Sequence, residues 1–139
     1  AESFTGGLFA EMITSIPGSS KSFELCLVTY SNLSKKILLD IPDDILSTYG
    51  AVSNEVATSM SLNILKKYSL NRNCVSVSCT GVAGPDGGSQ SKPVGTAFFS
   101  FTYKNKNKTI KKEFSDSGRE LIRAKAIDFM VKTLINIVK

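Results

Sequence analysis

Residues 23–40 read FELCLVTYSNLSKKILLD, and two patterns meet in this stretch. The first half, 23–30, is a nearly continuous apolar run that contains Phe, Val and Tyr, which indicates a strand buried on both faces. The second half, 31–40, predicts a short helix, for which Ser31 or Asn32 is available as the N-cap. A buried strand followed directly by a helix is typical of α/β folds.

The segments on either side continue this alternation. Apolar residues at helical spacing predict helices at 7–16, 54–68 and 117–139, and Pro42 and Gly50 mark the start and end of a further short helix at 43–50. Alternating or apolar runs predict strands at 74–79, 95–103 and 108–114, the last two joined as a hairpin across 104–107. In the last helix, five residues are expected to face the core: Leu121, Ala124, Ile127, Val131 and Leu134. With no internal repeat and no linker, the sequence predicts a single-domain α/β sandwich with a mixed sheet.

The composition narrows the class of protein. The 139 residues are 42% hydrophobic and 21% charged, which fits one globular domain with a core. No apolar run approaches the roughly 18 residues of a membrane span, and we expect no signal peptide and no membrane partner. Three cysteines in apolar segments favour reduced core thiols in the cytoplasm. With no histidine and no CxxC pair, we expect no metal site.

The net charge of +5 is concentrated in one segment. YKNKNKTIKKE contributes Lys104, Lys106, Lys108, Lys111 and Lys112. A nucleic-acid patch and a solvated hairpin whose lysines protect its edge are the two interpretations. The absence of interleaved arginines and aromatics favours the hairpin, so we expect no nucleic-acid partner.

The motif AESFTGG, residues 1–7, passes from an expected strand end through Ser3 into the helix predicted at 7–16. Such a turn exposes a serine hydroxyl beside the free N–H groups of a helix start, which can stabilise an oxyanion. The simpler interpretation is that Ser3 or Thr5 caps the helix. Without histidine, the serine-nucleophile scheme that remains is chiefly the Ser-Lys variant.

The motif VTYSNLSKK offers an amine for that scheme. A lysine one turn into a helix after a buried strand can point back towards a neighbouring loop, and burial lowers the pKa of a lysine enough to make it a base. Lys35 and Lys36 both qualify, whereas the alternative is an ordinary surface lysine.

The glycine-rich loop, CTGVAGPDGG at 79–88, is a third candidate segment. Its glycines allow the backbone to approach a phosphate closely; the alternative is an ordinary surface loop.

Five motifs together resemble a known family. They are AESFTGG, PGSSKSFELCLVTYSNLSK, GAVS, TGVAGPDGG and KPVGT, in this order along the chain. The chain resembles the C-terminal domain of the CinA family (competence/damage-inducible protein A), over almost its whole length. The resemblance implies a three-layer α/β/α sandwich with a mixed β-sheet. It also implies a nicotinamide-nucleotide amidase, which converts nicotinamide mononucleotide to nicotinic acid mononucleotide and ammonia and needs no cofactor.

The resemblance also implies roles for individual residues. Ser3 is the nucleophile and Lys35, which closes the YSNxxK motif, is its base. Tyr30 either hydrogen-bonds the serine or orients the lysine, or is an ordinary aromatic residue at the strand end. The N–H groups around Thr5, Gly6 and Gly7 would hold the oxyanion. The remaining residues expected to bind substrate are Ser31, Asn32, Thr80, Gly81, Ala83, Gly84, Pro85 and Arg119. Arg119 would pair with phosphate, and the alternative is an ordinary surface arginine.

The chain also departs from the family pattern. Phe4 stands where the family usually has cysteine. Family members carry a helix and most of a strand before AES, so the resemblance implies that a native segment precedes residues 1–139. Related domains commonly form homodimers. The alternative function is a catalytically silent CinA-like module that binds a nucleotide or a protein and is linked to competence or DNA damage.

Overall fold

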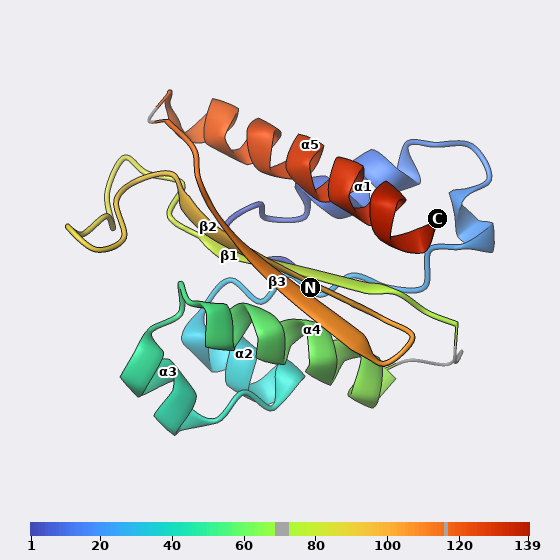
Figure 1. Cartoon of the computed structure of the whole chain (residues 1–139), viewed down its shortest axis with the longest axis horizontal. Coiled ribbons are helices and arrows are strands. Elements are labelled where there is room, and N and C mark those ends of the chain that lie inside the picture. The colour runs from blue at the N-terminus through green and yellow to red at the C-terminus, as the bar shows by residue number, and fades with distance from the viewer. Residues whose placement is uncertain (69–72, 116) are drawn as a thin grey trace.

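A computed structural model describes residues 1–68, 73–115 and 117–139. The helices are α1 (Leu8–Thr14), the single 3-10 turn η1 (Ser19–Lys21), α2 (Asn32–Leu39), α3 (Asp43–Tyr49), α4 (Asn54–Tyr68) and α5 (Arg119–Val138). The strands are β1 (Ser76–Gly81), β2 (Thr96–Tyr103) and β3 (Lys106–Glu113). Helices α1 and α5 cover one face of the sheet, and α2, α3 and α4 lie on the other (Figure 1). The predicted three-layer α/β/α sandwich is therefore confirmed.

The sheet combines both kinds of strand pairing. β1, β2 and β3 pair in this order and are antiparallel. Beyond β1, Glu2 forms parallel bridges with Cys79 on one side and Val28 on the other. The sheet is therefore mixed, as predicted, and the residues before α1 lie between β1 and the segment 23–30.

The prediction of a buried strand over 23–30 is wrong. Only Val28 in this segment bridges another chain segment, and Val28 and Tyr30 are exposed. The bridge partner of Val28 is Glu2, which lies directly before the turn at Ser3. Two hydrogen bonds, Glu2 N–H to Leu27 O and Thr29 N–H to Glu2 O, both of 2.8 Å, hold this extended segment.

Two further expectations need correction. The hairpin loop is Lys104–Asn105 rather than 104–107, because both residues adopt left-handed φ values, 48° and 62°, as a two-residue type I′ turn requires. In α5, Leu121 and Ala124 are exposed, whereas Ile122, Ala126, Ile127 and Met130 are buried. The helix carries apolar residues on more than one side, so its inward face could not be read from periodicity alone.

The core is divided between the two faces of β2. Alternate residues of this strand face opposite sides. Ala97, Phe99 and Phe101 join the buried side chains of α5 in one cluster. On the other face, Thr102 hydrogen-bonds Ser61 of α4 at 2.7 Å, and a second apolar cluster fills the space between α2 and α4. Each fully buried large apolar side chain contributes roughly 1.5–3 kcal/mol to the stability of the fold.

Within the described ranges, no helix is both long and apolar enough to cross a membrane.

Candidate active site

Ser3 lies in a tight turn between Glu2 and α1. The residue is buried, with 7% of its surface exposed. The turn is closed by a hydrogen bond from Gly6 N–H to Ser3 O of 3.0 Å. Gly6 and Gly7 both have positive φ, 61° and 97°, which explains two glycines directly before the helix. The sequence of this motif therefore encodes a sharp turn, and the serine lies where the chain leaves the sheet after Glu2.

The cap of α1 is neither Ser3 nor Thr5 but the side chain of Glu2. Its carboxylate accepts hydrogen bonds from the backbone N–H groups of Gly7, Phe9 and Ala10, at 2.9–3.1 Å. Thr5 Oγ1 also donates to Glu2, at 2.6 Å, so its hydroxyl points away from solvent. No sequence pattern identifies Glu2, because the known capping motifs place the cap next to the helix rather than six residues before it.

Lys35 comes from α2 and meets Ser3. Its Nζ lies 3.1 Å from Ser3 Oγ and 2.7 Å from the carbonyl oxygen of Thr29, and 3.4 Å from that of Tyr30. Only 1% of the lysine surface is exposed. Helix α2 starts with a capping box in which Ser31 Oγ accepts from Ser34 N–H, at 3.0 Å. The cap fixes the helix start one turn before Lys35 and so directs the side chain inward.

Burial changes the acid–base character of this lysine. Desolvation lowers the pKa of Lys35 from 10.5 to about 8, and the nearby Cys79 opposes the shift. No carboxylate pairs with Lys35 among the described ion pairs. By contrast, Lys36 points outward and forms an ion pair of 2.7 Å with Asp43. The two lysines that the sequence left open are therefore in opposite environments.

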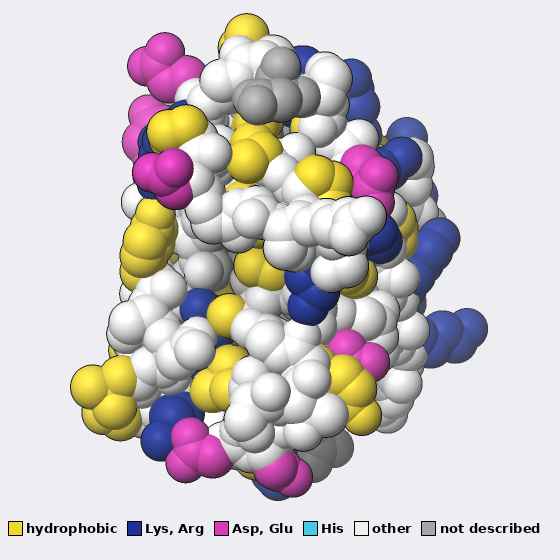
Figure 2. Space-filling model, turned by 90° about the vertical axis from the view of Figure 1, so that its left-hand side faces the viewer, with side chains coloured by type: hydrophobic (Ala, Val, Ile, Leu, Met, Phe, Trp, Pro, Cys, Tyr) yellow, Lys and Arg dark blue, Asp and Glu magenta, His cyan; other side chains and the backbone are white. Residues whose placement is uncertain are grey.

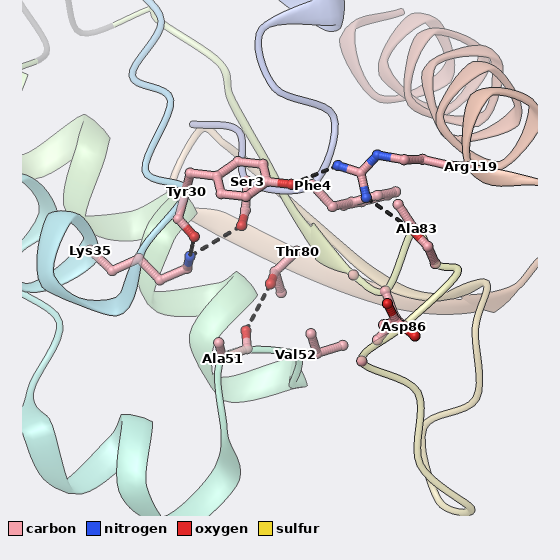
Figure 3. A pocket seen from close by; sticks show the side chains of 14 residues that line it. Ser3, Phe4, Tyr30, Lys35, Ala51, Val52, Thr80, Ala83, Asp86 and Arg119 are labelled. Atoms are coloured by element: carbon pink, nitrogen blue, oxygen red, sulfur yellow. Dashed lines mark hydrogen bonds between the residues drawn. The ribbon is translucent and has the colours of Figure 1, made fainter.

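Ser3 and Lys35 open into a pocket of about 270 Å³. Figure 2 shows this end of the molecule, where the surface is hollowed between side chains of mixed type. Figure 3 shows that the serine and the lysine lie at one side of the pocket and the glycine-rich loop at the other. The lining residues are Ser3, Phe4, Tyr30, Lys35, Ala51, Val52, Thr80, Gly81, Val82, Ala83, Gly84, Asp86, Gly87 and Arg119.

Tyr30 and Arg119 close one side of the pocket. The Arg119 guanidinium donates to the Tyr30 hydroxyl at 2.7 Å and to the carbonyl of Gly84 at 3.0 Å (Figure 3). The Tyr30 hydroxyl thus contacts Arg119, and no described hydrogen bond joins it to Ser3 or Lys35. Arg119 is the first residue of α5, so the pocket wall connects that helix, the loop after β1 and the segment before α2.

Some residues expected to bind substrate lie outside the pocket lining. They are Thr5, Gly6, Gly7, Ser31, Asn32 and Pro85. The first three form the turn behind Ser3, and Ser31 caps α2. Conversely, the lining includes Phe4, Ala51, Val52, Val82, Asp86 and Gly87. Ala51 and Val52 precede α4 and belong to the GAVS motif, which the sequence offered only as part of the family resemblance.

Two features shape the floor of the pocket. Thr80 is buried and its hydroxyl donates to Ala51 O at 2.8 Å. A Cβ on Gly81 would lie 2.9 Å from Thr96 O and 3.0 Å from the Phe4 ring, so only glycine fits between β2 and that ring.

Within the described residues, no three or more Cys, Asp or Glu side chains are grouped to hold a metal ion.

Comparisons with known proteins identify a family. Residues 1–138 match the family model described as the CinA C-terminal domain. The chain is 46% identical over 136 residues to the nicotinamide-nucleotide amidohydrolase PncC of Enterobacter agglomerans, covering 97% of this chain and 80% of that protein. It is also 43% identical to a CinA-like protein of Geotalea uraniireducens. That match covers 99% of this chain but 33% of the longer protein.

A solved structure extends the likeness to the fold. The competence/damage inducible protein CihA of Agrobacterium tumefaciens superposes with a TM-score of 0.93 at 35% sequence identity. The match covers 99% of this chain and 82% of that one. The arrangement of helices around the mixed sheet is therefore shared along nearly the whole chain.

Proposed function

We propose, from the premise that this chain belongs to the CinA C-terminal domain family, that it hydrolyses the carboxamide of nicotinamide mononucleotide. The products are nicotinic acid mononucleotide and ammonia. Identity of 46% to a nicotinamide-nucleotide amidohydrolase along 97% of the chain supports the activity. The observation that carries the mechanism is the 3.1 Å contact between Ser3 Oγ and Lys35 Nζ at the wall of a pocket.

The contacts of Lys35 fit both forms that a base must adopt: the ammonium donates to Ser3 Oγ, Thr29 O and Tyr30 O, and the neutral amine can keep the two carbonyl contacts. A neutral amine has two N–H donors and one lone pair. The carbonyl oxygens of Thr29 and Tyr30 only accept hydrogen bonds, so they take the two donors. The lone pair then faces the third neighbour, the hydroxyl of Ser3. With a pKa of about 8, about a tenth of the Lys35 side chains are neutral at pH 7.

The proposed reaction has two halves. Lys35 takes the Ser3 proton while Oγ bonds to the carboxamide carbon, and the resulting ammonium returns the proton to nitrogen as the C–N bond breaks and ammonia leaves. A water molecule then adds to the acyl ester, giving its proton to Lys35. The ester bond to Oγ breaks, Ser3 recovers a proton from Lys35, and the acid product leaves.

The donors that stabilise the oxyanion are the N–H groups of Phe4 and Thr5. Those of Gly6 and Gly7 are already used, one by Ser3 O and one by the Glu2 carboxylate. No described hydrogen bond takes the N–H of Phe4 or Thr5, and Phe4 lines the pocket. Loss of one oxyanion donor typically slows such a reaction about 10²–10³-fold.

The nucleotide part of the substrate lies against the glycine-rich loop and Arg119. Thr80, Gly81, Ala83 and Gly84 supply a backbone-rich wall. Arg119 forms no ion pair with a carboxylate in the described part of the chain, so its charge is available to a phosphate. The proposal includes Tyr30, whose hydroxyl holds Arg119 in place.

The test is ammonia release from nicotinamide mononucleotide by the purified chain, beside Ser3→Ala, Lys35→Ala and Lys36→Ala. We expect turnover by the wild type and by Lys36→Ala, and a loss of at least about 10³-fold in the other two. Lys36 is the matched control, because it is the adjacent lysine of the same helix but points away from the pocket and pairs with Asp43. No turnover by the folded wild type would contradict the activity and favour the silent binding module.

The wider setting of the enzyme is also proposed. Residues 1–139 act as one amidohydrolase domain, in the cytoplasm, where the three free cysteines remain reduced. The domain forms a homodimer, which the exposed apolar side chains of α2 support: Leu33 and Ile37, one turn apart, are each 62% exposed. Light scattering of the purified protein measures the oligomeric state, and a monomer at micromolar concentration would contradict this part.

A further inference from the structure

We propose that Glu2 is a positioning residue for the Ser-Lys pair, which holds the turn of Ser3 and the backbone behind Lys35 in one fixed relation. The inference rests on the proposed function. The reaction proposed above gives no role to a buried carboxylate. The surface of Glu2 is only 1% exposed. Glu2 therefore touches no substrate and acts through its neighbours.

The side chain of Glu2 holds the nucleophile side of the pair. Oε2 accepts hydrogen bonds from Thr5 Oγ1 at 2.6 Å, and from the N–H groups of Gly7 and Phe9 at 3.1 Å. Oε1 accepts from Ala10 N–H at 2.9 Å and from Cys26 Sγ at 3.4 Å. Four of these five donors belong to the turn after Ser3 or to the first residues of α1. The position of Ser3 is thus set by a carboxylate that ties the turn to the helix.

The backbone of Glu2 holds the base side of the pair. Its carbonyl accepts from Thr29 N–H at 2.8 Å, and Thr29 O in turn accepts from Lys35 Nζ at 2.7 Å. The residue adjacent to the nucleophile and the residue that orients the base are therefore bonded directly to one another. A shift of Glu2 would change the distance between Ser3 Oγ and Lys35 Nζ from both ends.

The pattern of donors requires a carboxylate at this position. All five groups around Glu2 donate hydrogen bonds, and an ionised carboxylate is the side chain that only accepts. Glutamine has the same shape, but its NH₂ group would face donors whichever way the amide is turned. At least two of the five donors would then lose their acceptor, because each carboxylate oxygen accepts at least two. The partial positive charge of the α1 start also favours an anion here.

The experiment compares Glu2→Gln and Thr5→Val with the wild type and with Ile64→Ala. Thr5→Val removes one donor to Glu2 and leaves the carboxylate in place. Ile64 is buried in the cluster between α2 and α4, so its truncation destabilises the fold without touching the turn. All proteins are assayed with nicotinamide mononucleotide below their unfolding temperatures, and the rate at which a fluorophosphonate labels Ser3 is measured in parallel.

We expect kcat to fall about 10–100-fold in Glu2→Gln and about threefold in Thr5→Val, with KM changed less than threefold, because misplacement of reacting groups by about 1 Å has this effect. Labelling of Ser3 should slow by the same factors, and Ile64→Ala should keep the wild-type kcat.

Wild-type kcat and labelling in a destabilised Glu2→Gln would overturn the proposal, as would a rise in KM at unchanged kcat. If Glu2→Gln does not fold, Thr5→Val carries the test, and wild-type labelling of that variant overturns it. Failure of the wild type to release ammonia would refute the proposed function instead, while the labelling rates still decide the role of Glu2.

Discussion

The two helices that begin at the candidate site, α1 and α2, start in different ways. Helix α2 is capped locally and in solvent, by the exposed Ser31 three residues from its partner Ser34. Helix α1 has no side-chain cap from its own N-cap residue, Gly7, and depends on the buried Glu2. A local cap orders a helix by itself, whereas a remote cap also ties the helix to the sheet. The nucleophile lies within the remote cap and the base follows the local one.

The largest effect on this comparison should come from Lys35→Met, which removes the base and keeps the local cap. We expect amidase activity to fall at least about 10³-fold, and the free energy of unfolding to rise at pH 7. A pKa lowered from 10.5 to about 8 corresponds to a cost of roughly 3 kcal/mol for the folded state below pH 8. Denaturant unfolding at pH 7 measures the gain.

The pH dependence of this stability difference provides a control. Between about pH 8 and 10.5 the unfolded chain binds more protons at Lys35 than the folded one, so wild-type stability rises with pH in this window. The advantage of Lys35→Met should therefore shrink from pH 8 to 10.5. Lys36→Met, which removes the half-buried neighbouring lysine of the same helix, is the matched control for the loss of one positive charge. An advantage independent of pH would contradict a depressed pKa.

The next effect is on the pH dependence of catalysis. If neutral Lys35 is the base, kcat/KM for nicotinamide mononucleotide should rise about tenfold per pH unit below pH 8 and level off above it. Initial rates of ammonia release between pH 6 and 9.5 give the profile. A profile that is flat from pH 6 to 8 would argue against this lysine as the base.

The smallest effect should come from Ser31→Ala, which removes the local cap of α2. We expect a loss of about 1 kcal/mol in the free energy of unfolding, the usual cost of an exposed N-cap. The value of kcat should fall less than threefold, because α2 is also held by the fully buried Leu39. Thermal melts and ammonia assays measure both. A loss of kcat as large as that expected for Glu2→Gln would remove the distinction between the two caps.

The same contrast explains what could be predicted from the sequence. The five α-helices and the strands β1 to β3 follow from periodicity and turn residues, whereas the three-layer order came from the family resemblance. The sequence limited the cap of α2 to Ser31 or Asn32, and the structure has Ser31. The role of Glu2 could not be predicted in this way, because it depends on contacts with residues three to twenty-four positions away. The strand expected at 23–30 fails for a related reason: apolar composition indicates extended chain, but only a neighbouring strand can provide the ladder.

The sequence also predicted only part of the candidate site. Absence of histidine limited the base to an amine, but the choice between Lys35 and Lys36 came from a family resemblance. The structure separates them by burial. Ala51 and Val52 line the pocket from the residues before α4, and no pattern of residue types marks such small apolar side chains as pocket walls.

Phe4 has a consequence for how this pocket can diverge. The ring belongs to the apolar cluster under α5, packs edge-to-face on Phe99 with ring centroids 6.4 Å apart, and also lines the pocket. Truncating a buried phenylalanine typically costs 3–5 kcal/mol. Acquiring a larger substrate by shortening this side chain would therefore consume much of the stability margin of a domain this small. A new substrate specificity is easier to acquire on the side of the glycine-rich loop, 79–88, because substitution of its exposed residues costs less stability.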